Sequence, residues 1–343
     1  MNTKQILFTA PYEARLVDTE LAAPGEGEVL VRTEFTAISA GTERANLVGD
    51  KNISGVREQC TEVKFPRALG YSGAGVVEQI GSRVTNVKPG DRVVISFGLH
   101  RQYNLVGQSQ VHKIVHESVT SLEAAFVVIA GFSIAGIRKT RLEIGESAMV
   151  MGLGILGILA VQLCRIAGGV PVIAVDPNEA RRALALQNGA DHALDPTGPD
   201  FIDNVKALTY GKGVNSIIEV SGVSVALSQA LDCAAPFGRV ALLGCSRTPG
   251  APIDFYHQVH YPGVTIVGAN NFARPIRESS PGNWTASDDY GAILGLIAGG
   301  RLNIRPLLSA PISPEDAPDI YRHLAADPAG FPIGVAFDWR KLN

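Results

Sequence analysis

Cysteine and long apolar segments are both scarce in this chain of 343 residues. Its cysteines are Cys60, Cys164, Cys233 and Cys245, and no two of them form a C-x-x-C pair. Neither a disulfide framework nor a structural zinc cluster is therefore indicated. The longest apolar run, Ala148–Val161, is shorter than the roughly 20 residues of a membrane span, and the first residues lack the apolar core of a secretory signal. We therefore expect a cytoplasmic protein that does not enter a membrane.

Charge is scarce as well. Charged residues make up 18% of the chain, the net charge is −3, and no basic block is present. Nucleic acid or an anionic membrane surface is therefore not the expected partner. A hydrophobic share of 46% instead favours a compact globular protein, long enough for two domains that each bury a core. Glycine is abundant, with 37 residues, which favours tight strand-to-helix turns and close approach of the backbone to a ligand.

The amino-terminal third consists of short apolar runs separated by glycine and proline, such as Glu28–Thr33, Gly75–Ile80 and Asp91–Ser96. This pattern predicts short, mainly antiparallel strands. Beyond residue 271 the pattern predicts two helices and a last strand. We expect these at Tyr290–Ala298, Pro314–Ala326 and Gly334–Phe337.

The middle of the chain alternates short apolar runs with helix-length segments. The expected strands are Ala148–Met151, Val172–Val175, Ser216–Val220, Val240–Leu243 and Thr265–Val267. Ile155–Ala167 and Glu179–Asn188 are the clearest of the intervening helices. Such alternation is typical of a doubly wound parallel sheet, so we expect an α/β fold.

A glycine-rich segment follows the first of these strands and reads Gly152-Leu153-Gly154-Ile155-Leu156-Gly157. The spacing is that of G-x-G-x-x-G, in which the first glycine makes a tight turn and the second lets the backbone approach a pyrophosphate. The third lets the helix pack closely on the strand. The amino terminus of the following helix favours phosphate. We therefore predict a dinucleotide site, the alternative being a glycine-rich turn that binds no nucleotide.

An acidic residue, Asp176, closes the next strand at 176 − 152 = 24 residues from Gly152. The expected separation is about 20 residues, and a carboxylate there accepts the ribose hydroxyls of NAD and repels a 2′-phosphate. The sequence therefore favours NAD. Arg181 and Arg182 lie one helical turn further on and are within reach of a phosphate, so NADP stays the alternative.

Three later strands end in short polar or glycine-containing segments. Because ligands bind beyond the carboxyl ends of strands in such sheets, we expect these segments to line the cofactor, unless they are ordinary turns. The expected cofactor-binding residues are Gly152, Leu153, Gly154, Ile155, Leu156, Gly157, Asp176, Pro177, Arg181, Ser221, Leu243, Gly244, Ala269 and Asn270.

Four further segments carry a family likeness. Gly70–Val77 resembles the motif G-H-E-x-x-G-x-V, and Val87–Val93 resembles V-x-x-G-D-R-V. Ala40–Glu43 is similar to C-G-[ST]-D, and Ala130–Ser133 to C-G-F-S. Together they resemble the medium-chain dehydrogenase/reductase superfamily, in particular its zinc-type alcohol and polyol dehydrogenases. The resemblance extends over most of the chain.

This resemblance implies a GroES-like, mainly-β catalytic domain interrupted by an inserted Rossmann domain. The implied boundaries are residues 1–128 and 271–343 for the catalytic domain and 129–270 for the Rossmann domain. The active site is then expected in the cleft between them.

The departures from the family pattern concern zinc. The family holds its catalytic zinc through a cysteine, a histidine and a third cysteine or acid, where this chain has Ala40, Tyr71 and Ala130. Ser72 replaces the acid beside the histidine, and Phe97–Tyr103 stands near the place of the four-cysteine structural lobe. Because a catalytic zinc needs three protein ligands, we predict a zinc-independent member with no metal site.

Without zinc, hydrogen-bond donors must stabilise the substrate oxygen and pass a proton. Tyr71 is the first candidate, since it occupies a metal-ligand position, although it could also be a space-filling aromatic. Thr42 matches the family's proton-relay hydroxyl, with helix capping as its alternative. His100 is a candidate substrate contact, with a surface polar role as its alternative. The pairs His112/His116 and His257/His260 have a spacing that permits metal binding, but neither is expected to bind one.

Three functions follow from these observations. The first is hydride transfer between NAD(H) and a secondary alcohol or ketone of polyol or sugar-like type. The second is an NADPH-dependent enone or quinone reductase, and the third is a nucleotide-binding sensor or scaffold without catalysis. A small-molecule substrate and a homodimer or homotetramer are expected, with the edge strand Thr265–Val267 as a candidate for pairing across a two-fold axis.

Overall fold

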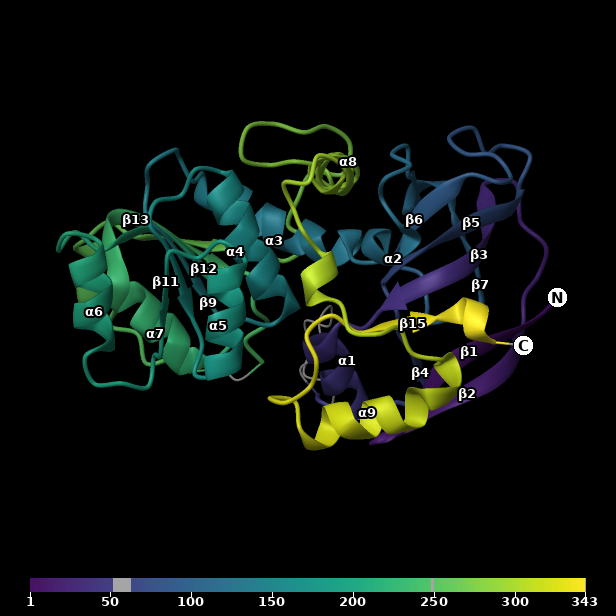
Figure 1. Cartoon of the computed structure of the whole chain (residues 1–343), viewed down its shortest axis with the longest axis horizontal. Coiled ribbons are helices and arrows are strands. Elements are labelled where there is room, and N and C mark those ends of the chain that lie inside the picture. Colours follow the sequence, from purple (N-terminus) through teal and green to yellow (C-terminus); the bar gives the residue numbers. More distant parts are fainter. Residues whose placement is uncertain (52–62, 248–249, 343) are drawn as a thin grey trace. The chain divides into compact units, whose positions relative to one another are not determined.

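The computed structural model describes residues 1–51, 63–247 and 250–342, which form two compact units. Unit 1 comprises Met1–Ile129, Leu294–Gly299 and Ile304–Asn343, and unit 2 comprises Ala130–Ile293 and Gly300–Asn303 (Figure 1). Residues 271–293 thus group with unit 2, whereas the boundary drawn from the sequence assigns them to the catalytic domain. Cys60 lies outside the described residues.

Unit 2 is built on a six-stranded parallel sheet with the strand order β11-β10-β9-β12-β13-β14. The strands are β9 (Ala148–Met151), β10 (Val172–Val175), β11 (His192–Leu194), β12 (Val214–Glu219), β13 (Ala234–Leu242) and β14 (Thr265–Gly268). The chain winds outward from β9 in one direction and then from β12 in the other, which is the doubly wound order of a dinucleotide-binding sheet. The expected α/β class is confirmed, and β11 is the strand that the sequence pattern missed.

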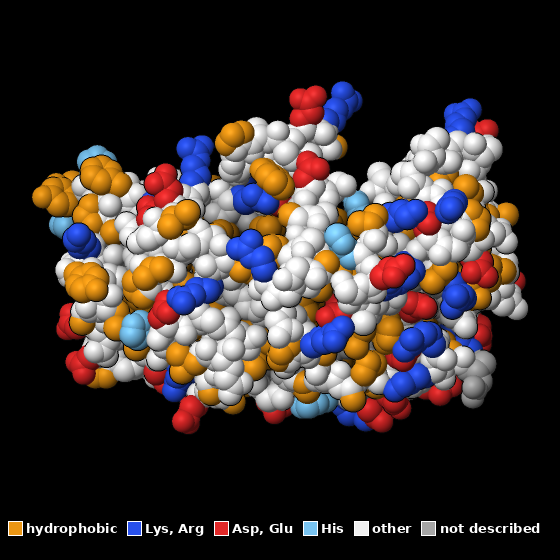
Figure 2. Space-filling model, turned by 45° about the horizontal axis from the view of Figure 1, so that its top comes forward, with side chains coloured by type: hydrophobic (Ala, Val, Ile, Leu, Met, Phe, Trp, Pro, Cys, Tyr) orange, Lys and Arg blue, Asp and Glu red, His pale blue; other side chains and the backbone are white. Residues whose placement is uncertain are grey.

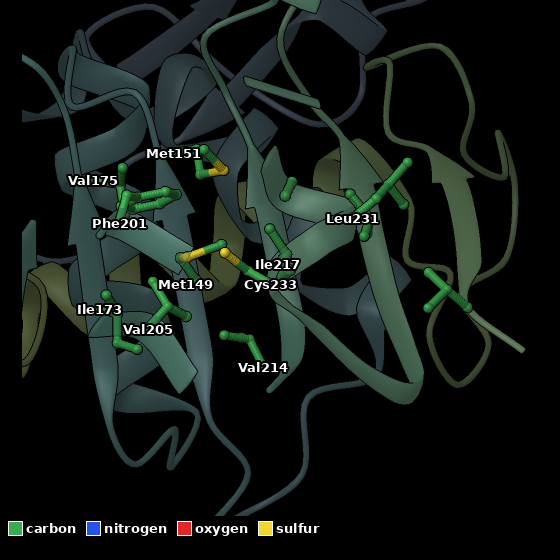
Figure 3. Close-up of a cluster of buried hydrophobic side chains, with 13 residues drawn as sticks. Met149, Met151, Ile173, Val175, Phe201, Val205, Val214, Ile217, Leu231 and Cys233 are labelled. Carbon is green, nitrogen blue, oxygen red and sulfur yellow. The ribbon is translucent and has the colours of Figure 1, made fainter. Parts of the chain in front are cut away.

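These strands are connected by the helices α4 (Ile155–Ile166), α5 (Glu179–Gln187), α6 (Phe201–Leu208) and α7 (Ser224–Cys233). The helix α3 (Val127–Thr140) precedes β9, and α8 (Ala286–Ala298) follows β14. Every residue of β9 and β10 is buried, because helices cover both faces of a parallel sheet. Figure 3 shows side chains of α6, such as Phe201 and Val205, packed beside Met149 and Ile173 of the sheet.

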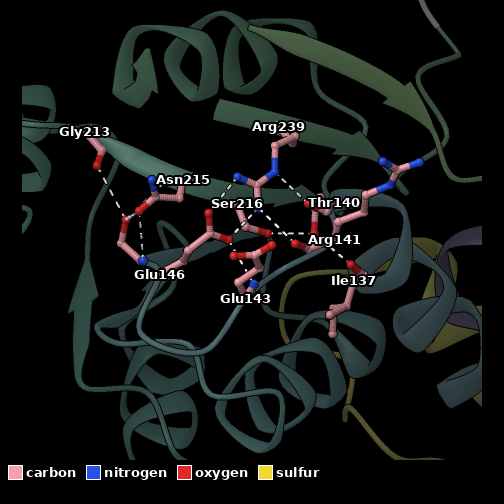
Figure 4. A network of polar contacts seen from close by, with 10 residues as sticks. Ile137, Thr140, Arg141, Glu143, Glu146, Gly213, Asn215, Ser216 and Arg239 are labelled. Carbon is pink, nitrogen blue, oxygen red and sulfur yellow. Dashed lines mark hydrogen bonds and ion pairs between the residues drawn. The ribbon is translucent and has the colours of Figure 1, made fainter. Parts of the chain in front are cut away.

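A polar network fastens the amino ends of the central strands (Figure 4). Arg239 of β13 donates to the carbonyl of Thr140 at 2.7 Å and to Glu146 at 2.8 Å. Ser216 of β12 donates to the hydroxyl of Thr140 at 2.7 Å. This edge lies opposite the carboxyl ends of the strands, so we assign the network to stability rather than to ligand binding.

Unit 1 contains two antiparallel sheets, in agreement with the alternating sequence pattern. The larger has the order β15-β3-β5-β6-β8, with β7 paired to β3, and the smaller has the order β2-β1-β4. The strands are β1 (Asn2–Ala10), β2 (Glu13–Glu20), β3 (Glu28–Ala37), β4 (Arg67–Ala68), β5 (Ser72–Ile80), β6 (Arg92–Ser96), β7 (Tyr103–Gly107), β8 (Val111–Lys113) and β15 (Ala336–Asp338). The helices are α1 (Ala40–Leu47), α2 (Ser121–Ala124) and α9 (Ala317–Ala326).

The core of unit 1 has two parts. Valines of β3, β5 and β6, including Val31, Val77 and Val93, fill the interior of the larger sheet. Trp339, Tyr321 and other large side chains fill the space around α9 and the smaller sheet. The expected helix Pro314–Ala326 begins as a 3-10 turn, Pro314–Asp316, and α9 itself starts at Ala317.

The surface agrees with the low charge of the sequence. Figure 2 shows basic and acidic side chains interspersed over the face that it presents. Among the described residues, no helix has both the length and the apolar character needed to cross a bilayer.

Candidate functional site

The glycine-rich turn in unit 2 connects the carboxyl end of β9 to the start of α4. Gly152 has a φ of 94°, a left-handed conformation that favours glycine, and a Cβ there would lie 2.9 Å from the backbone nitrogen of Ser221. A Cβ at Gly157 would lie 1.8 Å from the carbonyl oxygen of Gly152. These two glycines are therefore required by the packing of the chain itself.

Gly154 is different, because a Cβ there would meet no atom within 4 Å. It is the N-cap residue of α4, with φ −70° and ψ −170°, a conformation that any residue adopts. The packing of the chain therefore does not require a glycine at this position. Open space beside the first amides of α4 is what a bound pyrophosphate needs.

Asp176 follows β10 and is 5% exposed. Its carboxylate accepts hydrogen bonds from the backbone nitrogens of Leu153 and Asn178, both at 2.8 Å. The acid thus joins its own loop to the glycine-rich turn. A carboxylate has about four acceptor positions, so these two bonds leave capacity for ribose hydroxyls.

The two arginines after Asp176 differ in their surroundings. Arg182 donates through Nη1 to the carbonyls of Asp176 and Pro177, each at 2.8 Å, and to Asp195 at 3.1 Å. It is therefore committed to holding the loop, which argues against it as a ligand for a 2′-phosphate. Arg181 is half-buried, and its backbone nitrogen donates to Asn178, the N-cap of α5.

The segments after β12 and β13 pack against each other at the carboxyl edge of the sheet. A Cβ at Gly244 would lie 2.4 Å from the backbone nitrogen of Gly222. Leu243 precedes Gly244, and both donate backbone hydrogen bonds to the carbonyl of Glu219. After β14, Ala269 is 1% exposed and donates to the carbonyl of Leu242 at 3.0 Å, and Asn270 follows it.

Glu219, at the end of β12, is a residue of this edge that sequence reasoning missed. Its carboxylate accepts from the backbone nitrogen of Ser221 at 2.8 Å, from the Ser221 hydroxyl, and from the nitrogen of Gly222 at 3.1 Å. Burial raises the pKa of Glu219, and these hydrogen bonds oppose the rise only in part. The sequence signal that could have identified Glu219 is an acidic residue at the end of a buried strand, similar to the position of Asp176 directly after β10.

The expected cofactor residues therefore meet at one edge of the sheet, with room beside Gly154 and an acceptor at Asp176. These features fit a dinucleotide. When bound, such a cofactor supplies or accepts the hydride, while the chain binds and orients it.

A second group of polar residues lies in unit 1, around the start of α1. Tyr71 is half-buried, and its hydroxyl donates to Ser39 Oγ at 2.5 Å. Ser39 is the N-cap residue of α1, and Thr42 lies in the first turn of the helix. Thr42 is therefore not the N-cap residue of α1; Ser39 holds that position, without a side-chain capping hydrogen bond. Ser39 was not identified from the sequence.

His100 is 1% exposed, so it is not a surface residue. One ring nitrogen lies 2.7 Å from Thr36 Oγ1, and the other lies 3.2 Å from Glu43 Oε2. Tyr321 donates to the same Glu43 oxygen at 2.6 Å, and burial together with Glu43 raises the pKa of Tyr321 well above its usual value. Both nitrogens of His100 are therefore engaged within the protein, which argues against direct contact with a substrate.

The possible ligands for a metal ion are few in the described part of the chain. Among residues 1–51, 63–247 and 250–342, no group of three or more histidine, cysteine or acidic side chains is placed to hold a metal ion. Ala40 offers no donor atom, and Tyr71 is hydrogen-bonded to Ser39. The described donor set therefore does not fit a catalytic zinc.

The histidine pairs also have local partners. His112 faces Ser96 at 3.2 Å, and burial lowers the pKa of His112 to about 4, so it is neutral at physiological pH. His257 lies 2.7 Å from Asp254 on an exposed helical turn, Phe255–His260.

Comparisons with known proteins agree with this architecture. Residues 25–121 match the alcohol dehydrogenase GroES-like domain, and residues 156–281 match the zinc-binding dehydrogenase family. The L-threonine 3-dehydrogenase of Pyrococcus furiosus is 30% identical, over 89% of this chain and 90% of that protein. The D-guloside 3-dehydrogenase of Escherichia coli is 28% identical, over 93% and 95%. The crystal structure of benzyl alcohol dehydrogenase from Acinetobacter calcoaceticus aligns with a TM-score of 0.83 over 98% of this chain and 99% of that one, at 21% identity.

Proposed function

Because the chain belongs to the medium-chain, zinc-type alcohol dehydrogenase-like superfamily, whose members named above are dehydrogenases, we propose a specific reaction for this NAD(P)-dependent oxidoreductase. It transfers a hydride between NAD(H) and a secondary alcohol or ketone of polyol or sugar-like type, without zinc. The observation that carries this proposal is the joined pair of Asp176 and the glycine-rich turn. A relative named as a guloside dehydrogenase supports a sugar-like substrate.

The preference for NAD over NADP rests on charge and on available donors. Asp176 presents a buried carboxylate beside the turn, where a 2′-phosphate would meet like charge. Arg182, one of the two cations near it, is held by Asp176, Pro177 and Asp195. We therefore expect NADH to bind more tightly than NADPH.

The proton is proposed to move through Tyr71. In the structure its hydroxyl donates to Ser39 Oγ at 2.5 Å. When Ser39 instead donates to the Tyr71 oxygen, the Tyr71 hydroxyl donates its proton toward the substrate oxygen. This hydrogen bond stabilises the negative charge on that oxygen, which a Lewis acid would otherwise do. Thr42 is half-buried in the same helix turn and is proposed as a relay hydroxyl. His100 is proposed to position Glu43 and Thr36 rather than to touch the substrate.

We further propose that the protein is cytoplasmic and forms a homodimer or homotetramer. β14 is an edge strand of the parallel sheet, and two large aromatic side chains beside it, Phe237 and Tyr261, are each 79% exposed. An unpaired edge flanked by apolar surface favours association with a second copy. Light scattering after size exclusion tests this, and a monomer would contradict it.

The test of the reaction is nicotinamide absorbance with NAD(H) and NADP(H), measured in a chelator against polyols, ketoses, enones and quinones. Chelator-resistant, NAD-linked oxidation of a polyol or sugar would support the proposal. Loss of activity in the chelator would refute the zinc-free mechanism. Turnover with enones or quinones alone would favour a reductase, and tight NADH binding without turnover of any substrate would favour a sensor.

A further inference from the structure

Unit 1 contains a cavity of about 550 Å³ that is open to solvent and is lined by residues of β3, α2, the segment 305–310 and the turn Trp339–Lys341. These elements belong to the part of unit 1 around α2, β3 and β15 in Figure 1. None of the residues that line it belongs to the cofactor or catalytic sets proposed above.

Two arginines line the cavity, and a buried carboxylate holds each of them. Arg305 donates through Nε to Glu123 at 2.9 Å, and the Glu123 side chain is 6% exposed. Arg340 donates through Nε and Nη2 to the two oxygens of Asp338, at 2.8 and 2.9 Å. The Arg340 guanidinium also lies 4.4 Å from the ring centre of Phe35.

These pairings leave one nitrogen of each guanidinium available. Nη1 of Arg305 and Nη1 of Arg340 have no hydrogen-bond partner within the described part of the chain. A guanidinium has five donors in a fixed planar fork, so an arginine that is held along one edge presents the others in a defined direction. The hydrogen bonds to Asp338 raise the pKa of Arg340, which therefore stays charged.

Glu123 and Asp338 balance the charge of the two arginines and Glu34 also acts on Arg340, so the cavity carries no net positive charge. A ligand is thus held by directed hydrogen bonds more than by net charge, which favours a monoanion over a dianion. The lining also includes apolar side chains, among them Leu122 and Leu308, beside the hydroxyl-bearing residues Thr120, Ser121 and Ser309. The apolar side chains suit the apolar body of a small organic acid.

We propose that this cavity is a binding site for a small organic carboxylate, whose oxygens accept hydrogen bonds from Arg305 and Arg340. The hydroxyl of Ser309, which also lines the cavity, supplies a further polar contact. The site is independent of hydride transfer, because it shares no residue with the groups proposed for that reaction.

The test is a titration of the full chain with benzoate, followed by ligand-detected NMR. Saturable binding to the wild type is expected, with at least about a tenfold loss of affinity in Arg305→Gln, since a charge-assisted hydrogen bond is removed. Ala310→Phe adds a phenyl ring to the lining while keeping both arginines, so it narrows the cavity and should also weaken binding. Arg322→Gln is the matched control, because Arg322 pairs with Asp319 on the surface of unit 1 outside the cavity, and it should bind benzoate like the wild type.

Several outcomes would overturn the proposal. One is the lack of saturable benzoate binding by the folded wild-type protein. Another is an equal loss in Arg322→Gln and Arg305→Gln, which would indicate nonspecific charge attraction. Tighter binding of inorganic phosphate than of benzoate would refute the assignment to a carboxylate. Because the readout is binding rather than turnover, each of these results leaves the dehydrogenase proposal intact.

Discussion

Replacing Gly154 and Gly157 by alanine separates a glycine needed for a ligand from one needed for the fold. A Cβ at Gly154 would meet no atom within 4 Å, and the backbone there suits any residue. The Gly154→Ala protein should therefore fold normally. Its stability should change by no more than about 1 kcal/mol, since alanine restricts the unfolded chain but is a poorer N-cap than glycine.

Cofactor binding should respond in the opposite way. The added methyl group of Gly154→Ala projects into the space where the pyrophosphate is expected to approach the start of α4. We expect the Kd for NADH to rise at least about tenfold, which corresponds to about 1.4 kcal/mol. Fluorescence titration with NADH measures this value, and thermal unfolding measures the stability.

Gly157→Ala is the matched comparison. Its Cβ would lie 1.8 Å from the carbonyl oxygen of Gly152, so α4 must move away from the turn. Overpacking of this kind typically costs about 1–3 kcal/mol, or a fall in Tm of about 2–12 °C for a domain of this size. If Gly154→Ala binds NADH as tightly as the wild type, the assignment of this turn to the cofactor is refuted. If it loses as much Tm as Gly157→Ala, the inference that packing does not require a glycine at position 154 is refuted.

Other expectations follow from the same geometry. Asp176→Ser should lower the ratio of NADPH to NADH dissociation constants by about tenfold or more, because a repulsive charge is removed; an unchanged ratio would contradict the ribose role. Tyr71→Phe should lower kcat with little change in the Kd for NADH. Ser39→Ala should flatten the pH profile of kcat. Unchanged kinetics in both variants would reject Tyr71 as the proton donor. The hydrogen bonds from Arg239 lower the pKa of Glu146 in the folded state, although burial opposes them. The pair therefore stabilises the protein at pH values above the unfolded pKa of Glu146. This stabilisation is lost as the pH falls through the lowered pKa of the folded state. The Tm difference between wild type and Glu146→Gln should therefore be largest near neutral pH and shrink under acid; a difference that does not vary with pH would contradict this.

The Rossmann unit was readable from sequence because its signals are local. Ala148–Met151 and Val172–Val175 are continuous apolar runs with the bounds of β9 and β10, since strands covered on both faces carry no polar alternation. The sequence pattern does not predict β11, because this strand has three residues, of which two are half-buried and one is exposed. Such a short segment shows no recognisable alternation of apolar and polar residues. The apolar pattern predicts a helix that begins at Tyr290, whereas α8 begins at Ala286, because the first turn of α8 is polar.

The candidate site was readable only in part. The glycine spacing and the position of Asp176 lie within one short stretch, so the sequence alone was enough to predict a dinucleotide turn and the acid that closes it. The replacement of zinc ligands by Ala40 and Tyr71 was visible by comparison with the family pattern. The stretches that resemble that family are also short and continuous, as are the apolar runs that define the fold class.

Tertiary structure alone decided which side chains meet. Ser39 reaches Tyr71 across 32 positions of sequence, and Tyr321 reaches Glu43 across 278. Burial of His100 between Thr36 and Glu43 engages both of its ring nitrogens, so we propose a positioning role in place of the expected substrate contact. The cavity that joins Arg305 to Arg340 had no sequence signal either. Local patterns record backbone conformation and burial, whereas a hydrogen bond between distant residues depends on how the sheets bring their side chains together, and no short-range periodicity encodes that.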